Sequence, residues 1–216
     1  MILIDYLISL NLFSLLFVLS VFLVAVVVIL CLMSKSCINL HCLLEPRDLQ
    51  KLLPVPEIFL ALGSNLGDRG KNLEKAVTEL RVFVEVNQIS PIYESEPKYV
   101  TDQPWFLNMV VAGNTALSAS DLLAHLKELE VIIGRTPSER YGPRKIDLDI
   151  IFYGDNLIAL PDLTIPHPSL EERMFVLRPL ADIAPAKLHP ASGMTVRELL
   201  GDLQGEEEFK CLAFVC

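Results

Sequence analysis

Ile146–Tyr153 reads IDLDIIFY and carries the clearest strand pattern in the chain. Side chains alternate between the two faces of a β-strand, so the apolar residues at alternate positions are expected to face a core while Asp147 and Asp149 face the opposite side. With a rise of about 3.3 Å per residue, the two carboxylates lie roughly 6–7 Å apart. This stretch therefore predicts a packed sheet and, on its other face, an acidic pair.

The acidic pair has two interpretations. Carboxylates on one face repel each other unless cations share them. Hard oxygen ligands suit Mg²⁺, which takes one or two protein carboxylates and completes its shell with water and phosphate oxygens. The alternative is an edge strand from which Asp147 and Asp149 simply face solvent.

A basic cluster precedes the strand and falls within eleven positions: Arg135, Arg140, Arg144 and Lys145. Guanidinium groups bind phosphate oxygens bidentately. Gly142-Pro143 predicts a tight turn that brings Arg144 close to the acidic pair. Metal-binding carboxylates beside a basic loop are what a nucleoside triphosphate site requires, whereas the alternative is a solvated charged loop.

The overall charge narrows the class of partner. The chain has 216 residues and a formal net charge of -9, and the charges up to Pro56 cancel, so the acidic excess belongs to residues 57–216. General nucleic-acid binding needs a basic surface, and we expect none. The five cysteines form no C-x-x-C pair, which predicts neither a disulfide framework nor a zinc site and favours a reducing compartment.

The spacing of apolar residues predicts the order of the elements. Two helices are expected, one with apolar positions from Leu73 to Val84 and one that starts at the capping residue Ser118 and stops at Gly134. Four strands are expected, over Glu57–Leu62, Val86–Ser95, Phe106–Thr115 and Ile146–Tyr153. The order β-α-β-β-α-β is the split βαβ arrangement of ferredoxin-like folds, an α+β class. The tail, Phe175–Leu203, is expected to add two short helices around Pro179 and Pro185.

The N-terminal region differs in composition. No charged residue occurs from Tyr6 to Met33, so residues 1–33 are predicted to form a hydrophobic helix that is long enough to span a membrane. Residues 34–56 read as a linker, and residues 57–216 as the globular domain. Basic residues after the apolar segment would hold that domain in the cytoplasm, anchored through residues 6–33. A start at Met33 is the alternative, and a cleaved signal peptide fits poorly because there is no basic n-region.

The segment Arg140–Ile151 resembles the signature of the 6-hydroxymethyl-7,8-dihydropterin pyrophosphokinase family, enzymes of folate biosynthesis. The shared pattern is a basic residue, an aromatic residue, Gly-Pro-Arg, two residues, and then Asp-Leu-Asp. Further motifs occur in the same order and at the same spacing: Leu62–Asp68 (LGSNLGD), Gln103–Asn108 (QPWFLN) and Ile165–Pro168 (IPHP), with Arg173 and Phe175 beyond. The resemblance runs from about Glu57 to Leu203.

The resemblance implies a ferredoxin-like fold and transfer of pyrophosphate from ATP to 6-hydroxymethyl-7,8-dihydropterin. It implies that Asp147 and Asp149 hold two Mg²⁺ ions. The other candidates take their roles by position: Arg135 and Arg144 neutralise charge in catalysis; Arg140, His167 and Arg173 bind ATP; Gly63, Ser64, Asn65, Ser95, Phe106, Asn108 and Phe175 form the pterin pocket. Some of these residues also have a plain structural interpretation: Phe106 and Phe175 as core residues, Asn108 as a strand amide that pairs with a loop, and His167 and Gly63-Ser64-Asn65 as turn residues.

Two departures from the family pattern concern the basic loop. Thr136–Glu139 is one residue shorter than in some members and has Pro137 where basic residues are often found, so one phosphate contact is expected to be missing. Tyr141 stands where tryptophan is common, which keeps an aromatic ring. The loop is a candidate lid over bound ATP.

Two rival functions stay open at this point. Another two-metal nucleotide transferase on a ferredoxin-like core would share the acidic pair but has no need for the Phe-Leu-Asn segment. A non-catalytic, membrane-tethered relative would bind the same ligands without reaction. Association with other folate enzymes, such as dihydropteroate synthase or the pathway's aldolase, is a further expectation because this family is sometimes fused to them.

Overall fold

The computed structural model describes residues 55–136, 139, 141–203 and 209–213. The chain divides into two units, Met1–Leu52 and Leu53–Cys216, and the described residues all belong to the second. The hydrophobic helix expected over residues 1–33, and nearly all of the expected linker, lie outside the described residues. Within the described part, no helix is both long and apolar enough to cross a membrane.

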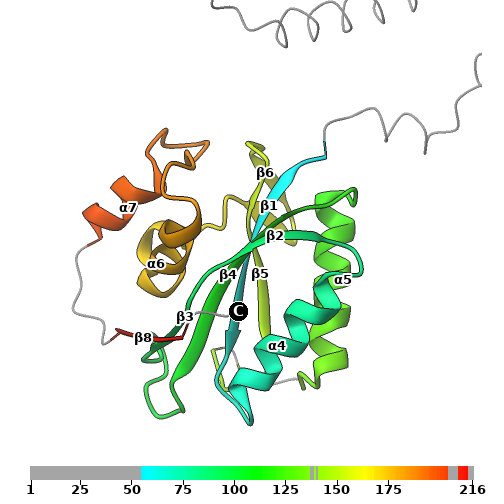
Figure 1. The fold of residues 1–216 in the computed structure, drawn as a ribbon, viewed down its shortest axis with the longest axis vertical. Helices are drawn as coiled ribbons and strands as arrows, with labels where there is room; N and C mark the ends of the chain where they lie inside the picture. The colour runs from blue at the N-terminus through cyan, green and yellow to red at the C-terminus, as the bar shows by residue number, and fades with distance from the viewer. Residues whose placement is uncertain (1–54, 137–138, 140, 204–208, 214–216) are drawn as a thin grey trace, which may run out of the picture. The chain divides into compact units, whose positions relative to one another are not determined.

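An antiparallel sheet forms the centre of the second unit (Figure 1). Its strands are β1 (Glu57–Ser64), β2 (Glu85–Ile89), β3 (Ile92–Ser95), β4 (Phe106–Asn114), β5 (Asp147–Tyr153) and β8 (Phe209–Ala213). The strand order is β5-β1-β4-β3-β8, and β2 also pairs with β4. This is the pairing expected from the βαββαβ order, with β1 between the last and the third expected strands and β5 at one edge of the sheet.

The second expected strand, over Val86–Ser95, is divided into β2 and β3 at Ser90 and Pro91. Pro91 has no N–H to donate to a ladder. Ser90 compensates next to it, since its backbone N–H donates to the Val110 carbonyl and its Oγ accepts from the Val110 N–H, each at 2.9 Å. The side chain of Ser90 thus replaces one backbone partner of β4, and the strand continues as two pieces.

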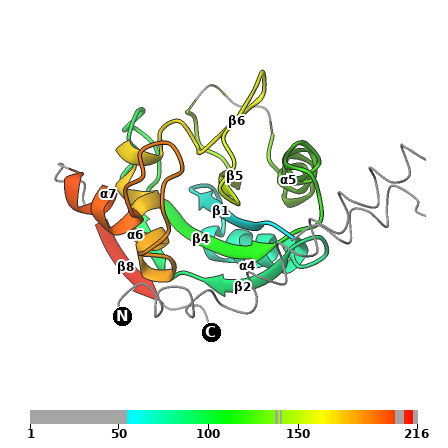
Figure 2. The same ribbon diagram turned by 90° about the horizontal axis from the view of Figure 1, so that it is seen from above.

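Each face of the sheet carries a separate apolar core. Helices α4 (Arg69–Leu80) and α5 (Ala119–Ile133) cover one face, and α6 (Met174–Ile183) and α7 (Val196–Asp202) cover the other (Figure 2). Along β1, Ile58 and Leu60 pack in the core under α4 and α5, whereas Phe59 packs in the core under α6 and α7. Because a central strand is buried on both faces, nearly all of its side chains are apolar or small.

The capping signals of α5 lie where the sequence predicts them. The Ser118 side chain accepts from the Asp121 N–H, and Gly134 ends the helix in the left-handed region at φ 104°. Glycine adopts that conformation without the strain of a Cβ. The helix therefore ends immediately before Arg135, which fixes where the basic segment begins.

The region after β5 departs from the sequence prediction. β6 (Ile158–Leu160) and β7 (Leu163–Ile165) form a two-stranded hairpin, and a 3₁₀ turn (Leu170–Glu172) precedes α6. Pro179 lies within α6 as expected, but Pro185 lies after the end of that helix, and α7 begins only at Val196. The second helix instead begins at a capping box formed by Thr195 and Glu198.

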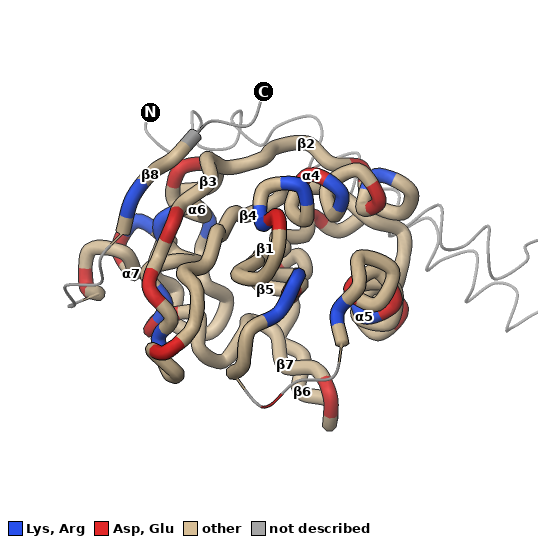
Figure 3. Tube along the Cα trace, turned by 90° about the horizontal axis from the view of Figure 1, so that it is seen from below, with Lys and Arg blue, Asp and Glu red and all other residues tan. Residues whose placement is uncertain are grey.

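Acidic and basic residues are both spread over the described part of the chain. Viewed from below, the trace shows no continuous band of Lys and Arg (Figure 3). Any electrostatic attraction of a ligand must therefore come from a local group of charged side chains.

Gly113 tests the close packing of β4 against the start of β2. A Cβ at this position would lie 2.5 Å from the Glu85 carbonyl oxygen and 2.8 Å from Val84 Cγ1. Gly113→Ala is expected to lower the free energy of unfolding by about 1–3 kcal/mol, as overpacking does. The matched control is Gly201→Ala in α7, where a Cβ meets nothing within 4 Å and a gain of up to about 1 kcal/mol is expected. Urea unfolding of the full chain measures both, and equal stability of the two variants would contradict this packing.

Candidate active site

A cavity of about 320 Å³ lies against the end of the sheet where β5 begins. Its walls come from β1, β4 and the segment that precedes it, from α5, β5 and the segment between them, and from the start of α6. Most of the candidate residues line it: Gly63, Ser95, Phe106, Asn108, Arg135, Arg144, Asp147, Asp149, Arg173 and Phe175. Segments far apart in the sequence thus place the predicted acidic, basic and aromatic side chains around one space.

The side chains of β5 alternate as predicted. Leu148 and Ile150 are buried in the core under α4 and α5, whereas Asp147 and Asp149 lie on the other face and line the cavity. β5 is an edge strand, as the solvent-exposed alternative supposed. Both carboxylates nevertheless face cationic side chains, so they do not simply face solvent.

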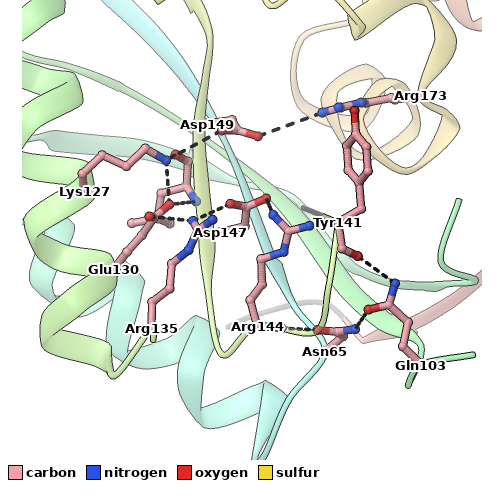
Figure 4. Close-up of polar contacts among 11 residues, drawn as sticks. Asn65, Gln103, Lys127, Glu130, Arg135, Tyr141, Arg144, Asp147, Asp149 and Arg173 are labelled. Atoms are coloured by element: carbon pink, nitrogen blue, oxygen red, sulfur yellow. Dashed lines mark hydrogen bonds and ion pairs between the residues drawn. The ribbon is translucent and has the colours of Figure 1, made fainter. Parts of the chain in front are cut away.

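Asp147 joins two of the predicted arginines. Arg135 Nη1 lies 2.7 Å from Asp147 Oδ1, and Arg144 Nη1 lies 3.0 Å from Asp147 Oδ2 (Figure 4). Arg144 comes from the turn before β5, and Arg135 lies just after the end of α5. Arg140, the third predicted arginine of this segment, lies outside the described residues, as do Pro137 and Ser138 of the candidate lid.

Asp149 is less well compensated than Asp147. Its carboxylate oxygens lie 4.0 Å from Lys127 Nζ and 4.0 Å from Arg173 Nη1, beyond hydrogen-bonding distance. Burial raises the pKa of Asp149 and the charge of Asp147 raises it further, although Lys127, His167 and Arg173 oppose the increase. The ionised form of Asp149 is therefore costly in the protein alone.

Asp147 and Asp149 fit a Mg²⁺ ion for which the protein supplies only some of the ligands. In the described ranges, no three His, Cys, Asp or Glu side chains are grouped so that they could hold a metal. Two hard oxygen ligands are nevertheless what Mg²⁺ takes when phosphate and water complete its shell. The weak compensation of Asp149, whose cationic neighbours lie 4.0 Å away, leaves its oxygens able to accept a metal ion.

The aromatic wall of the cavity comes from β4 and α6. Phe106 and Phe175 both line the cavity, with the Arg144 guanidinium carbon 5.9 Å from the Phe106 ring centroid and the Arg173 carbon 5.8 Å from the Phe175 centroid. Asn108 Nδ2 donates to Ser95 Oγ at 2.9 Å. The side chain of Asn108 therefore has a fixed orientation on the cavity wall.

Gly63 has a packing reason beside Asn108. A Cβ on Gly63 would lie 3.2 Å from Asn108 Oδ1 and 3.8 Å from the Phe106 ring. Glycine at this position thus keeps the amide and the ring close to β1.

Two residues predicted to line the pterin pocket do not lie on the cavity wall. Ser64 and Asn65 are buried, and Ser64 Oγ donates to the Lys145 carbonyl. Asn65 Oδ1 accepts from the Arg144 N–H at 2.7 Å, and its Nδ2 donates to Gln103 Oε1 and to the Pro104 carbonyl, each at 3.0 Å. They hold the segments that carry Arg144 and Phe106.

His167 lies on the wall of a second hollow, beside the β6–β7 hairpin. Its Nδ1 accepts from the Ser169 N–H at 3.2 Å, which is the turn-shaping role considered as its alternative. Burial lowers the pKa of His167 while the charge of Asp149 opposes the decrease. The ring is thus electrostatically linked to Asp149 without lining the main cavity.

The sequence reasoning missed the cavity residues Tyr99 and Lys127, together with Glu130 behind them, and it noted Gln103 and Tyr141 in motifs without giving either a role in the site. Tyr99 and Tyr141 stack with ring centroids 4.3 Å apart, and Gln103 Nε2 donates to the Tyr141 carbonyl at 3.0 Å. The sequence held one signal for Glu130. It lies in the apolar stripe of α5, and an acidic side chain that is buried there needs a cationic or hydrogen-bonding partner.

The raised pKa of Asp149 makes a prediction about stability. The folded state binds the Asp149 proton more tightly than the unfolded state does, so stability falls as the pH rises from the ordinary Asp pKa of 3.8 through the raised folded-state pKa, and the loss is complete above it. Asp149→Asn is expected to stabilise the ligand-free protein by about 0.5–2 kcal/mol at neutral pH. The gain should shrink as the pH falls toward the ordinary Asp pKa of 3.8.

Thermal unfolding in a chelating buffer at several pH values measures this difference. Asp147→Asn is the control, and it should destabilise the protein because Arg135 and Arg144 lose a common partner. A lower melting temperature for Asp149→Asn than for the parent chain at neutral pH would contradict the electrostatic account.

Comparisons with known proteins agree with this geometry. Residues 59–185 match the family model described as 7,8-dihydro-6-hydroxymethylpterin-pyrophosphokinase (HPPK). The chain is 40% identical over 141 residues to the 2-amino-4-hydroxy-6-hydroxymethyldihydropteridine pyrophosphokinase of Aquifex aeolicus, covering 65% of this chain and 88% of that protein. It is 47% identical over 128 residues to a mitochondrial folate synthesis bifunctional protein of Pisum sativum, covering 59% of this chain but 25% of the relative.

Among solved structures, the chain is similar to the crystal structure of Plasmodium falciparum HPPK-DHPS. The TM-score is 0.56 at 16% sequence identity, over 68% of this chain and 44% of the other. This likeness supports the fold alone. The chain therefore spans most of the Aquifex relative and only a fraction of the pea and Plasmodium proteins.

Proposed function

The chain belongs to the 7,8-dihydro-6-hydroxymethylpterin-pyrophosphokinase family, and we propose that it transfers pyrophosphate from ATP to 6-hydroxymethyl-7,8-dihydropterin, releasing AMP. One observation supports this proposal above all. Asp147 and Asp149 line a cavity with aromatic walls, and Arg135 and Arg144, residues of a type that binds phosphate, pair with Asp147 there. In the proposed reaction, the hydroxymethyl oxygen of the pterin attacks the β-phosphorus of ATP. The bond from the β-phosphorus to the α,β-bridging oxygen breaks, and AMP leaves.

Charge neutralisation is the main task of the residues around β5 in this proposal. Arg135 and Arg144 would bind phosphate oxygens and neutralise the charge that develops during transfer. Arg173, on the opposite wall, would contact the nucleotide together with His167 and Arg140. Asp147 and Asp149 would hold Mg²⁺, two ions in our proposal, and bound Mg²⁺ neutralises and orients phosphate oxygens.

The aromatic wall would hold the acceptor. Phe106 and Phe175 offer apolar ring faces to a flat heterocycle, which prefers offset stacking. Asn108 can both donate and accept hydrogen bonds at the edge of the pterin, and its bond to Ser95 restricts its rotation. Gly63, Ser64 and Asn65 would shape the pocket through the backbone and through the segments they hold. Orientation of the attacking oxygen is the expected result.

The relatives' names also suggest an association. The pea relative is called bifunctional and the Plasmodium structure combines HPPK with DHPS. We propose on this ground that the domain works beside another enzyme of folate synthesis. A membrane anchor at residues 6–33 remains an expectation about residues outside the described part.

AMP formation tests the proposed reaction. The full chain, mixed with ATP, Mg²⁺ and the pterin alcohol, is expected to release AMP only when all three are present. Asp149→Asn should lower turnover by about a hundredfold or more, because a lost metal ligand removes several kcal/mol of charge stabilisation. The control Asp202→Asn, exposed on α7, should leave turnover unchanged. ATP consumption that does not need the pterin would favour another nucleotide transferase, and binding of both ligands without AMP would favour the non-catalytic alternative.

Phe175→Ala tests the aromatic wall. It is expected to weaken pterin binding by roughly tenfold, since stacking and apolar contact are lost, and to leave ATP binding nearly unchanged. Titration calorimetry with each ligand measures the two affinities. Phe83 is partly buried against the core under α4 and α5 and does not line the cavity, so Phe83→Ala should lower stability without this selectivity. Equal loss of both affinities in Phe175→Ala would argue for misfolding.

A further inference from the structure

We propose that Lys127 is an additional phosphate-binding residue of this cavity and that buried Glu130 holds it in position. The proposal rests on the proposed function, because it assumes that a nucleoside triphosphate enters the cavity. It concerns two side chains of α5 that the sequence motifs do not include.

Lys127 reaches the cavity from the middle of α5, and its position there is fixed by two hydrogen bonds. Its Nζ donates to Glu130 Oε1 at 2.8 Å and to the Leu148 carbonyl at 3.0 Å. The side chain is 44% exposed and lines the cavity, with Nζ 4.0 Å from Asp149 Oδ1. An ammonium group has three donors, so the two bonds leave one more for a ligand. A lysine held in this way gives up little further conformational entropy when an anion binds.

Glu130 is the fixed point of this arrangement. Only 3% of its side chain is exposed, and both carboxylate oxygens have partners. Oε1 accepts from Lys127 and from the Leu148 N–H, the latter at 2.8 Å, while Oε2 lies 2.6 Å from Arg135 Nη1. One buried carboxylate therefore aims two cations, Lys127 and Arg135, into the same space (Figure 4).

The charges around the cavity favour a binding role for Lys127. Lys127, Arg135, Arg144 and Arg173 form one connected group with the carboxylates of Glu130, Asp147 and Asp149. Without Lys127, the three arginines are balanced by the three carboxylates. With Lys127, this group carries a net positive charge next to the place proposed for the phosphates, which attracts an anionic ligand.

A purely structural role is the competing account. β5 is an edge strand, and Glu130 and Lys127 together pair with the N–H and the carbonyl of Leu148 on its outer side. Covering these groups stabilises the sheet edge. If this were the only role, replacement of Lys127 would change stability and leave nucleotide affinity intact.

The test compares Lys127→Met with Lys75→Met in the full chain. Lys75 lies on α4, is exposed, and donates to the Ile132 carbonyl away from the cavity. Titration calorimetry with Mg²⁺ and a non-hydrolysable ATP analogue is expected to show about a tenfold to hundredfold weaker affinity for Lys127→Met, the scale of a charge-assisted hydrogen bond. The pterin affinity of this variant, and both affinities of Lys75→Met, should match the parent chain.

Two further variants separate binding from folding. Lys127→Arg retains the charge and is expected to recover most of the ATP affinity. Glu130→Gln should weaken ATP binding, and in the double variant its effect should add only in part to that of Lys127→Met, because Glu130 positions both the Lys127 ammonium and Arg135. An ATP affinity of Lys127→Met equal to that of the parent chain, or an equal loss for ATP and pterin, would overturn the proposal. AMP release by the parent chain is read separately, so failure of the reaction and failure of this inference are distinguishable.

Discussion

The backbone of Leu148 in β5 is bound by two charged side chains of α5, and this interaction links the fold of the domain to its cavity. Leu148 lies on the edge strand β5, and its outer N–H and carbonyl have no neighbouring strand to pair with among the described residues. Glu130 and Lys127 of α5 provide those partners through their side chains. Because a carboxylate and an ammonium group complete the sheet edge, the charged groups of Glu130 and Lys127 are held close to Asp147 and Asp149. An apolar cover would have protected the edge equally well, but it would have left the cavity with fewer cations.

The two carboxylates of β5 differ in how well the protein compensates their charge. Asp147 has two arginine partners, whereas Asp149 has only cations at 4.0 Å and a raised pKa. A cation bound at this site, as proposed, would lower the electrostatic cost of the ionised Asp149 carboxylate. The cost is tolerated because the two apolar cores on either side of the sheet hold β5 in place. Preorganisation of this kind is expected wherever catalysis depends mainly on position and charge.

Much of the fold could be predicted from the sequence because its signals are local. The alternation in β5, the apolar spacing of α5 and the cap at Ser118 each specify one element, and the structure agrees. The β6–β7 hairpin was missed because strands of three residues are too short to show a period. The division of β2 from β3 depends on how Ser90 pairs with Val110, a contact between distant residues that no local pattern reveals.

For the site, the motifs led to most of the cavity residues, and the turn interpretation of Gly63–Asn65 allowed a structural role, but the motifs did not show which segments Ser64 and Asn65 hold. Their partners, Lys145 and Arg144, are about eighty positions away in the sequence, so only the fold brings them together. Glu130 was missed because acids on helices usually face solvent.

The last described strand has a practical consequence for the limits of the domain. The family match ends at residue 185, yet β8 pairs with β3, and Phe209 stacks on Tyr93 with ring centroids 4.5 Å apart. Phe209 is also the register partner of Ser95, the residue that orients Asn108. A clone trimmed to the matched region would lose the outer support of β3 and the apolar contacts of α7. Truncation for crystallisation should accordingly spare the C-terminal segment, because an edge strand that loses its neighbour exposes a row of unpaired backbone groups.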